Sequence, residues 1–136
     1  MSDSGRPGEI PQAGPRPVYL DLIRIRQPVP AVVSILHRLS GAVLFLIGIP
    51  LLLWAVQQSL VSPDGYASLQ ARLALPIVKL LLLGLVWAYL HHFCAGIRYL
   101  LLDLHIGTEL KPARQSSYAV LIVSLALAAI VGARLW

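Results

Sequence analysis

Three long apolar stretches, separated by short polar segments, dominate the pattern of this 136-residue chain. The first runs from about residue 31 to 58, and no charged residue occurs between Arg38 and Asp64. The second covers about 75–104 and the third about 116–134. Because about 20 consecutive apolar residues suffice to cross a bilayer as a helix, each stretch predicts one transmembrane helix. Pro50 lies inside the first stretch, where we expect it to kink the helix.

The polar segments divide the chain into an arm and one domain. Residues 1–18 are rich in proline and glycine and contain no long apolar run, which predicts a flexible arm and neither a secretion signal nor a span. Residues 19–136 are expected to form a single three-helix transmembrane domain. The segment 62–65, Ser-Pro-Asp-Gly, predicts a turn after the first span, and residues 107–114 predict a polar connection between the second and third.

Composition supports an all-α integral membrane protein. Hydrophobic residues make up 57% of the chain and charged residues 12%, against about 25% charged in soluble domains. A soluble domain of this size could not bury so much apolar surface. The single cysteine, Cys94, excludes a disulfide within the chain. The net charge of +5 does not indicate nucleic-acid binding, because the basic residues flank the spans and form no single face.

The basic residues also predict the topology. With three spans, the N-terminal segment and the loop between the second and third spans lie on one side of the membrane. They carry Arg6, Arg16, Arg24, Arg26, Lys111 and Arg114. The other side carries only Arg72, Lys79 and Arg134. The positive-inside rule therefore places the N-terminus in the cytoplasm and the C-terminus in the periplasm.

Two adjacent histidines, His91 and His92, lie within the second span. An ionisable side chain inside the membrane is costly and marks a candidate functional site, and neutral imidazole is a common metal ligand. Neighbouring helical residues point about 100° apart, so the two rings cannot serve one site along one line. His92 shares a helical stripe with Gly96, which leaves space for a flat cofactor. A haem ligand, a proton relay and a helix–helix hydrogen bond all remain open from the residue types.

The start of the first span carries a second polar group. Ser34, His37 and Arg38 share one helical face, which Gly41 continues. A hydroxyl, an imidazole and a guanidinium suit the polar head of a largely apolar ligand, such as a quinone or a porphyrin propionate. Alternatively, Arg38 snorkels to lipid phosphates.

Arg98 adds a further cation at a related depth. It follows His92 by six residues, about 9 Å along a helix axis, which places it near the level of His37 and Arg38. Basic groups at the rim with an imidazole deeper in the membrane would suit haem, with propionates at the rim and iron within.

These motifs resemble the cytochrome b membrane-anchor subunit of bacterial succinate dehydrogenase, respiratory complex II. The resemblance covers about residues 16–136. It is carried by Arg16-Pro17-Val18, Leu20-Asp21-Leu22, Ser34-Ile35-Leu36-His37-Arg38, Ser40-Gly41, Ser62-Pro63-Asp64-Gly65, His92, Gly96-Ile97-Arg98 and Asp103. Tyr99 departs from the pattern, because some relatives have another histidine there.

The resemblance implies roles for individual residues. His92 would be an axial ligand of haem b, and His91 its neighbour. The implied quinone contacts are Ser34, Ile35 and Arg38, and the implied haem-propionate contacts are His37, Arg38 and Arg98. A companion small anchor subunit would supply the second haem ligand.

The resemblance also implies the setting. The chain would be a non-catalytic subunit of an inner-membrane complex, without an active site of its own. A flavoprotein and an iron–sulfur subunit would pass electrons from succinate to ubiquinone beside it. The choice between ubiquinone and menaquinone and a trimer of such heterotetramers stay open. The alternatives are a small transporter subunit with a His/Arg proton or anion path, and a structural anchor that binds no cofactor.

Overall fold

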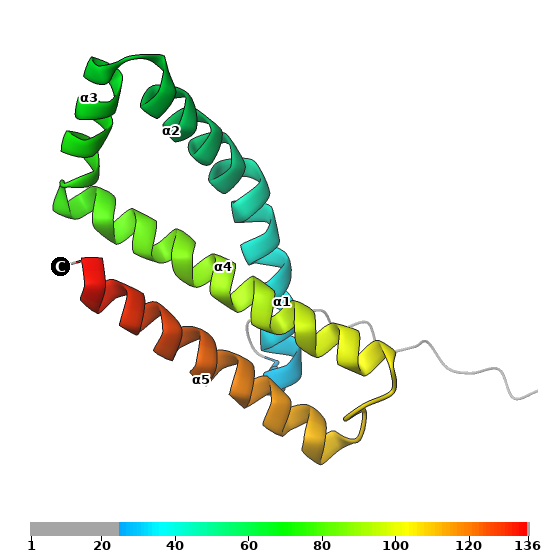
Figure 1. The fold of residues 1–136 in the computed structure, drawn as a ribbon. Helices are drawn as coiled ribbons and strands as arrows, with labels where there is room; N and C mark the ends of the chain where they lie inside the picture. The colour runs from blue at the N-terminus through cyan, green and yellow to red at the C-terminus, as the bar shows by residue number, and fades with distance from the viewer. Residues whose placement is uncertain (1–24, 136) are drawn as a thin grey trace, which may run out of the picture.

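The structure is a computed structural model, and it describes residues 25–135. This part of the chain folds into helices joined by short turns (Figure 1). In chain order they are α1 (Val29–Val43), the π-helical segment η1 (Leu44–Gly48), α2 (Ile49–Val61), α3 (Pro63–Leu73), α4 (Pro76–Asp103) and α5 (Leu110–Leu135). The expected arm, residues 1–18, lies outside the described residues, as do Arg24 and Trp136.

Within residues 25–135, three helical stretches are long and apolar enough to cross a membrane, as the hydrophobic pattern predicts. They cover Val29–Val61, Pro76–Asp103 and Leu110–Leu135, with mean hydropathies of 2.4, 1.7 and 2.2. The first and third exceed the expected ranges, and the second is one residue shorter at each end. An all-helical chain with three such helices fits an integral membrane protein.

The first of these stretches is interrupted by η1, directly before Pro50. The Ile49 N–H donates to the Leu44 carbonyl, one residue beyond the α-helical reach. Proline has no N–H and its ring crowds the preceding turn, so the α-helical bond pattern must change there. We expected a kink at Pro50, and the structure shows a π segment directly before it.

The segment 62–65 corrects one expectation, since it begins a helix where the sequence predicted only a turn. Ser62 caps α3 by accepting a hydrogen bond from the Gly65 N–H at 3.0 Å. Pro63 occupies the first helical turn, where its missing N–H costs nothing, and Asp64 lies near the positive helix end. A Ser-Pro-Asp sequence is thus typical both of a turn and of a helix start, and in this chain it starts helix α3.

α4 is the central helix, and it packs against α5 along its length and against α1 near its carboxyl end (Figure 1). The α5 face that it meets carries mostly small side chains, namely Ser117, Val120, Ser124, Ala128 and Gly132. A Cβ at Gly132 would lie 3.3 Å from Leu83 Cδ1. Small residues allow close approach of the helix backbones, which is how membrane helices gain packing energy without a hydrophobic effect.

The two ends of the α4–α5 pair are held differently. After α4, His105 and Gly107 take left-handed φ values of 61° and 75°, which stop the helix and return the chain toward α5. α5 begins at Leu110, so the expected polar connection is shorter than residues 107–114. At the opposite end, the Lys79 ammonium donates to the Leu135 carbonyl at 2.8 Å.

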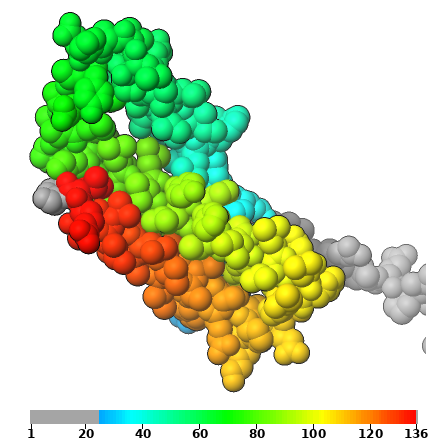
Figure 2. Space-filling view, viewed as in Figure 1, coloured from blue at the N-terminus to red at the C-terminus, as the bar shows by residue number. Residues whose placement is uncertain are grey.

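Many large hydrophobic side chains are exposed on the described chain, whose surface Figure 2 shows coloured by residue number. Phe45 and Leu60, for example, are 69% and 78% exposed. An exposed apolar surface of this kind marks lipid or partner contact. The backbone of the three long stretches is helical throughout, as a hydrocarbon environment favours. The membrane orientation of the termini stays a prediction.

Candidate functional site

The site is built where α1 crosses α4, and its centre is a pair of histidines 55 positions apart in the sequence. His92 Nδ1 lies 3.0 Å from the backbone carbonyl of His37. A carbonyl oxygen can only accept, so this contact requires the proton on Nδ1. The two imidazole rings also stack, with centroids 4.2 Å apart and planes 9° from parallel. The orientation of the His92 ring is therefore fixed by α1.

Ser40 and Gly41 of α1 also lie directly beside the His92 ring. The Ser40 hydroxyl donates to the same His37 carbonyl at 2.9 Å, and its oxygen lies 3.3 Å from His92 Nδ1. A Cβ at Gly41 would lie 2.8 Å from His92 Cε1, which is too close for any ordinary carbon contact. Only glycine at position 41 therefore leaves room for the His92 ring where it lies. The sequence indicated that Gly41 allows a close approach, and the structure identifies His92 as the group that approaches.

His92 Nε2 is left without a hydrogen bond within the described chain, and it is not one of the enclosed unpaired atoms. With the proton held on Nδ1, Nε2 carries the free lone pair. A backbone carbonyl bonded to the far nitrogen is the usual way in which proteins orient a metal-binding imidazole. His92 therefore has the chemistry of a single, oriented metal ligand whose Nε2 is not fully enclosed.

The space beside Gly96 is bordered by His37, which the stripe pattern did not predict. A Cβ at Gly96 would meet His37 Nε2 at 3.9 Å, an ordinary contact. The Tyr99 ring lies 5.1 Å from the His37 ring, and its hydroxyl is enclosed without a hydrogen-bond partner. His37 thus lies between His92 and Tyr99, and together they form one aromatic surface on α1 and α4.

Arg98 turns toward α5, and no described contact joins it to His37 or Arg38. It is 6% exposed, and its Nε donates to the Ser116 hydroxyl at 3.0 Å. Nη2 donates to the Ala113 carbonyl at 3.3 Å. Nη1 makes no hydrogen bond and is not enclosed. Arg98 therefore joins α4 to α5 through hydrogen bonds from Nε and Nη2. Its Nη1 remains available to donate a hydrogen bond to another group.

Ser34, Ile35 and Arg38 lie on α1 before the histidine pair. Ser34 is half-buried, whereas Ile35 and Arg38 are exposed. Neither the Ser34 hydroxyl nor the Arg38 guanidinium has a hydrogen-bond partner in the described chain. One hydroxyl and one guanidinium a helical turn apart are therefore available to a ligand or a partner.

His91 has a different environment from its neighbour. It is fully buried, its ring lies 5.5 Å from that of Trp87, and neither ring nitrogen has a hydrogen bond of acceptable geometry. The rotation of about 100° between adjacent helical residues produces this contrast. His91 belongs to the interior, whereas the half-buried His92 keeps a ring nitrogen that is not enclosed.

Within residues 25–135, no three histidine, cysteine or carboxylate side chains gather as a closed metal site. The arrangement offers one oriented imidazole together with polar groups on α1. Fold and site together define a small multi-pass membrane protein with a histidine that a neighbouring helix orients.

Comparison with known proteins agrees with this class. Residues 12–131 match the family model described as the succinate dehydrogenase/fumarate reductase transmembrane subunit. The chain belongs to this family, as its motifs indicated.

The relatives carry a consistent name. A succinate dehydrogenase cytochrome b556 subunit of Coxiella burnetii is 36% identical, over 89% of this chain and 97% of its own length. The subunit of the same name from Paracoccus denitrificans is 33% identical, over 85% and 88%. That of Rickettsia typhi is 29% identical, over 82% and 86%.

Proposed function

We propose that this chain is the membrane anchor of a succinate:quinone oxidoreductase that binds haem b through His92 and forms part of the quinone site. The observation that carries the proposal is the hydrogen bonding of the two ring nitrogens of His92. Its Nδ1 is bonded to the His37 carbonyl and its Nε2 is free. Family membership and the name cytochrome b556 among the relatives support the same reading.

The residues present fit haem b. His92 would hold the iron through Nε2. The close packing of the His92 ring against Gly41 fixes the position of this nitrogen. When bound, haem b supplies a one-electron redox centre. Arg38 and His37 on α1, and the free Nη1 of Arg98, are the groups that we assign to the propionates.

The second axial ligand belongs to a companion anchor subunit. His37 would not serve as that ligand, because its ring stacks flat on the His92 ring. His91 is enclosed by packing. His105 follows His92 by thirteen residues, about 20 Å along the helix direction. No other histidine of this chain is therefore suitably placed, and the haem is shared between two subunits.

The quinone site uses Ser34, Ile35 and Arg38. The Ser34 hydroxyl donates to a quinone carbonyl oxygen as negative charge develops during reduction, and the Arg38 guanidinium stabilises that charge. The exposed Ile35 side chain supplies an apolar contact for the ring. The chain thus contributes binding groups, while succinate oxidation takes place elsewhere in the complex.

The partners follow from this role. A flavoprotein and an iron–sulfur subunit deliver electrons from the cytoplasmic side, where the N-terminus lies. The chain is then a multi-pass protein of the bacterial inner membrane, and ubiquinone is the proposed acceptor.

The decisive experiment compares the two adjacent histidines. The chain is purified with its companions from its native membrane, and a reduced-minus-oxidised visible spectrum is recorded for the wild type, His92→Leu and His91→Leu. We expect a b-type spectrum in the wild type and in His91→Leu, and its loss in His92→Leu. A colourless wild-type preparation would refute haem binding and favour transport or bare anchoring. Equal loss in both variants would refute the specific role of His92.

A further inference from the structure

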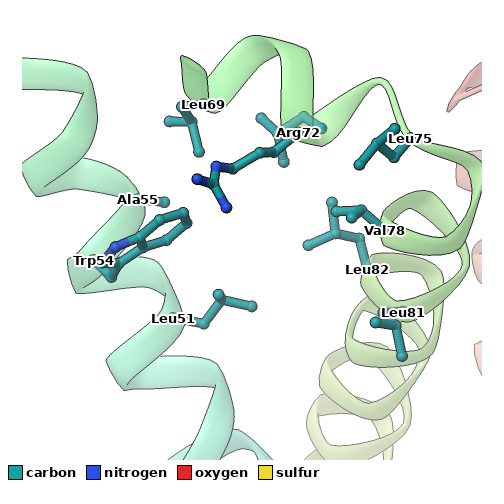
Figure 3. Close-up of a pocket in the computed structure, with 10 residues that line it drawn as sticks. Leu51, Trp54, Ala55, Leu69, Arg72, Leu75, Val78, Leu81 and Leu82 are labelled. Carbon is teal, nitrogen blue, oxygen red and sulfur yellow. The ribbon is translucent and has the colours of Figure 1, made fainter. Parts of the chain in front are cut away.

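A cavity lies at the opposite end of the molecule from the histidine pair. It has a volume of about 330 Å³, is partly open, and is lined by α2, α3 and the start of α4. Figure 3 shows its walls, which include Leu51, Trp54 and Ala55 of α2, Leu69 of α3, and Val78 and Leu82 of α4. This volume lies within the range of about 300–1,000 Å³ of small-molecule sites.

Arg72 is the charged residue of this wall. Its side chain extends from α3 into the cavity, and the guanidinium lies toward Trp54 (Figure 3). The guanidinium makes no hydrogen bond or ion pair within the described chain. The acidic residue of α3, Asp64, lies two helical turns away, near the other end of the helix. A cation therefore faces an apolar cavity, and no anion among residues 25–135 lies beside it.

The Arg72 charge and the apolar lining together indicate which kind of ligand the cavity would bind. Arg72 is exposed, so its guanidinium, at the edge of an apolar cavity, is open to an anionic or strongly polar partner from outside the described chain. Guanidinium groups bind phosphate oxygens through two parallel hydrogen bonds. Transfer of an acyl chain from bilayer to cavity gains little, because both are apolar. Selectivity at this place must therefore come from the head group at Arg72.

The location agrees with a lipid head group. α3 joins the ends of two membrane-spanning stretches, so Arg72 lies at the level where those stretches leave the bilayer. Trp54, 39% exposed beside it, is typical of the membrane interface. Leu82 precedes His92 by ten residues, about 15 Å along α4, so this cavity is separate from the histidine pair.

We infer that this cavity binds an anionic phospholipid, with its phosphate at the Arg72 guanidinium and part of an acyl chain between α2 and α4. The bound lipid fills the space between these helices and neutralises the cation. This inference is independent of the proposed haem and quinone roles.

The test uses the chain purified with its companions in detergent and stripped of lipid. Phosphatidylglycerol or phosphatidylcholine is added at rising concentration, and retained lipid per chain is measured by mass spectrometry. We expect preferential retention of phosphatidylglycerol. Arg72→Gln should weaken it about fivefold, the worth of one cation near a membrane surface. Arg134→Gln is the matched control, because Arg134 is an exposed arginine at the same end, outside the cavity.

A second variant tests the cavity itself. Ala55→Leu adds apolar volume to the wall without a change of charge, and it should also reduce phosphatidylglycerol retention. Equal retention of the two lipids, or an equal effect of Arg72→Gln and Arg134→Gln, would overturn the inference. It would also be overturned if Arg72→Gln destabilised the purified assembly equally with either lipid, because a carboxylate of a companion subunit would then be the partner of Arg72.

Discussion

The backbone carbonyl of His37 lies 3.0 Å from Nδ1 of His92 and holds the ring by a hydrogen bond. The acceptor belongs to the main chain of α1, so the orientation of the His92 ring depends on the position of the helix. It does not depend on which side chain residue 37 carries. The His37 side chain is instead a neighbour that stacks on the ring. These two contributions of one residue can be separated by mutation.

Gly41→Ala should disturb the His92 ring directly. The added Cβ would lie 2.8 Å from Cε1, so the ring or α1 must move by several tenths of an ångström. Loss of the groups that orient a metal ligand typically weakens metal binding about 10- to 100-fold. We expect lower haem content after purification and a shifted low-spin haem signal in electron paramagnetic resonance.

Gly84→Ala is the matched control for that change. Gly84 also lies in a membrane helix, and a Cβ there would meet nothing within 4 Å. It should leave haem content and the resonance signal unchanged. An identical response of the two variants would show that any glycine replacement has this effect, contrary to the geometry at Gly41.

His37→Phe should retain haem. Phenylalanine keeps a flat ring beside His92 and leaves the main-chain carbonyl in place, so His92 keeps its proton on Nδ1. We expect nearly wild-type haem content, measured by the pyridine haemochrome spectrum, with a changed midpoint potential because a polar neighbour is lost. Loss of haem in His37→Phe would mean that the imidazole itself is required.

The apolar pattern was sufficient to predict the three long apolar helices. Helical spacing puts His91, Ala95, Arg98, Leu102 and His105 on one stripe, and the structure buries the first three of these but not Leu102 or His105. Local signals were ambiguous at 62–65, where the same residues suit a turn and a helix start. The stacking of His37 on His92 could not be predicted, because it depends on how α1 crosses α4. For the same reason the sequence could not show that Arg98 turns toward Ser116.

Ser34→Ala should separate the two partial reactions of the proposed complex. Loss of the hydroxyl removes a donor to the quinone oxygen, and a buried donor of this kind is worth about 100-fold in rate. Ser34 is half-buried, so water can replace it in part, and we expect about a tenfold fall in succinate:quinone reductase activity. Succinate oxidation by an artificial dye should be unchanged.

Ser59→Ala serves as the control for Ser34→Ala. The Ser59 hydroxyl lies at the far end of the first stretch and is satisfied locally by the Val56 carbonyl at 2.7 Å. It should alter neither activity. Equal loss of the quinone and dye reactions in Ser34→Ala would contradict a quinone-site role.

The contact between Arg98 and Ser116 predicts a graded loss of stability. Ser116→Ala removes one hydrogen bond between membrane helices, which is worth about 0.6 kcal/mol on average. Arg98→Ala removes both bonds to α5 and the packing of a buried side chain, and bonds from charged groups are worth about 1.5–3 kcal/mol. The Ala113 carbonyl stays satisfied, because the Ser117 hydroxyl also donates to it at 2.7 Å. Thermal unfolding of the purified assembly should therefore rank the variants as wild type, Ser116→Ala and Arg98→Ala, in falling order.

The visible spectrum of the same variants separates packing from cofactor contact. Arg114→Ala, at an exposed position of α5, should change stability by less than about 0.5 kcal/mol and serves as the control. If Nη1 of Arg98 contacts a propionate, Arg98→Ala shifts the haem potential, whereas Ser116→Ala lowers stability and leaves the potential unchanged. Equal shifts of potential in both variants would mean that the position of α4 on α5, and not the Arg98 charge, controls the haem. A destabilisation by Arg114→Ala as large as that by Arg98→Ala would contradict the role of Arg98 in joining α4 to α5.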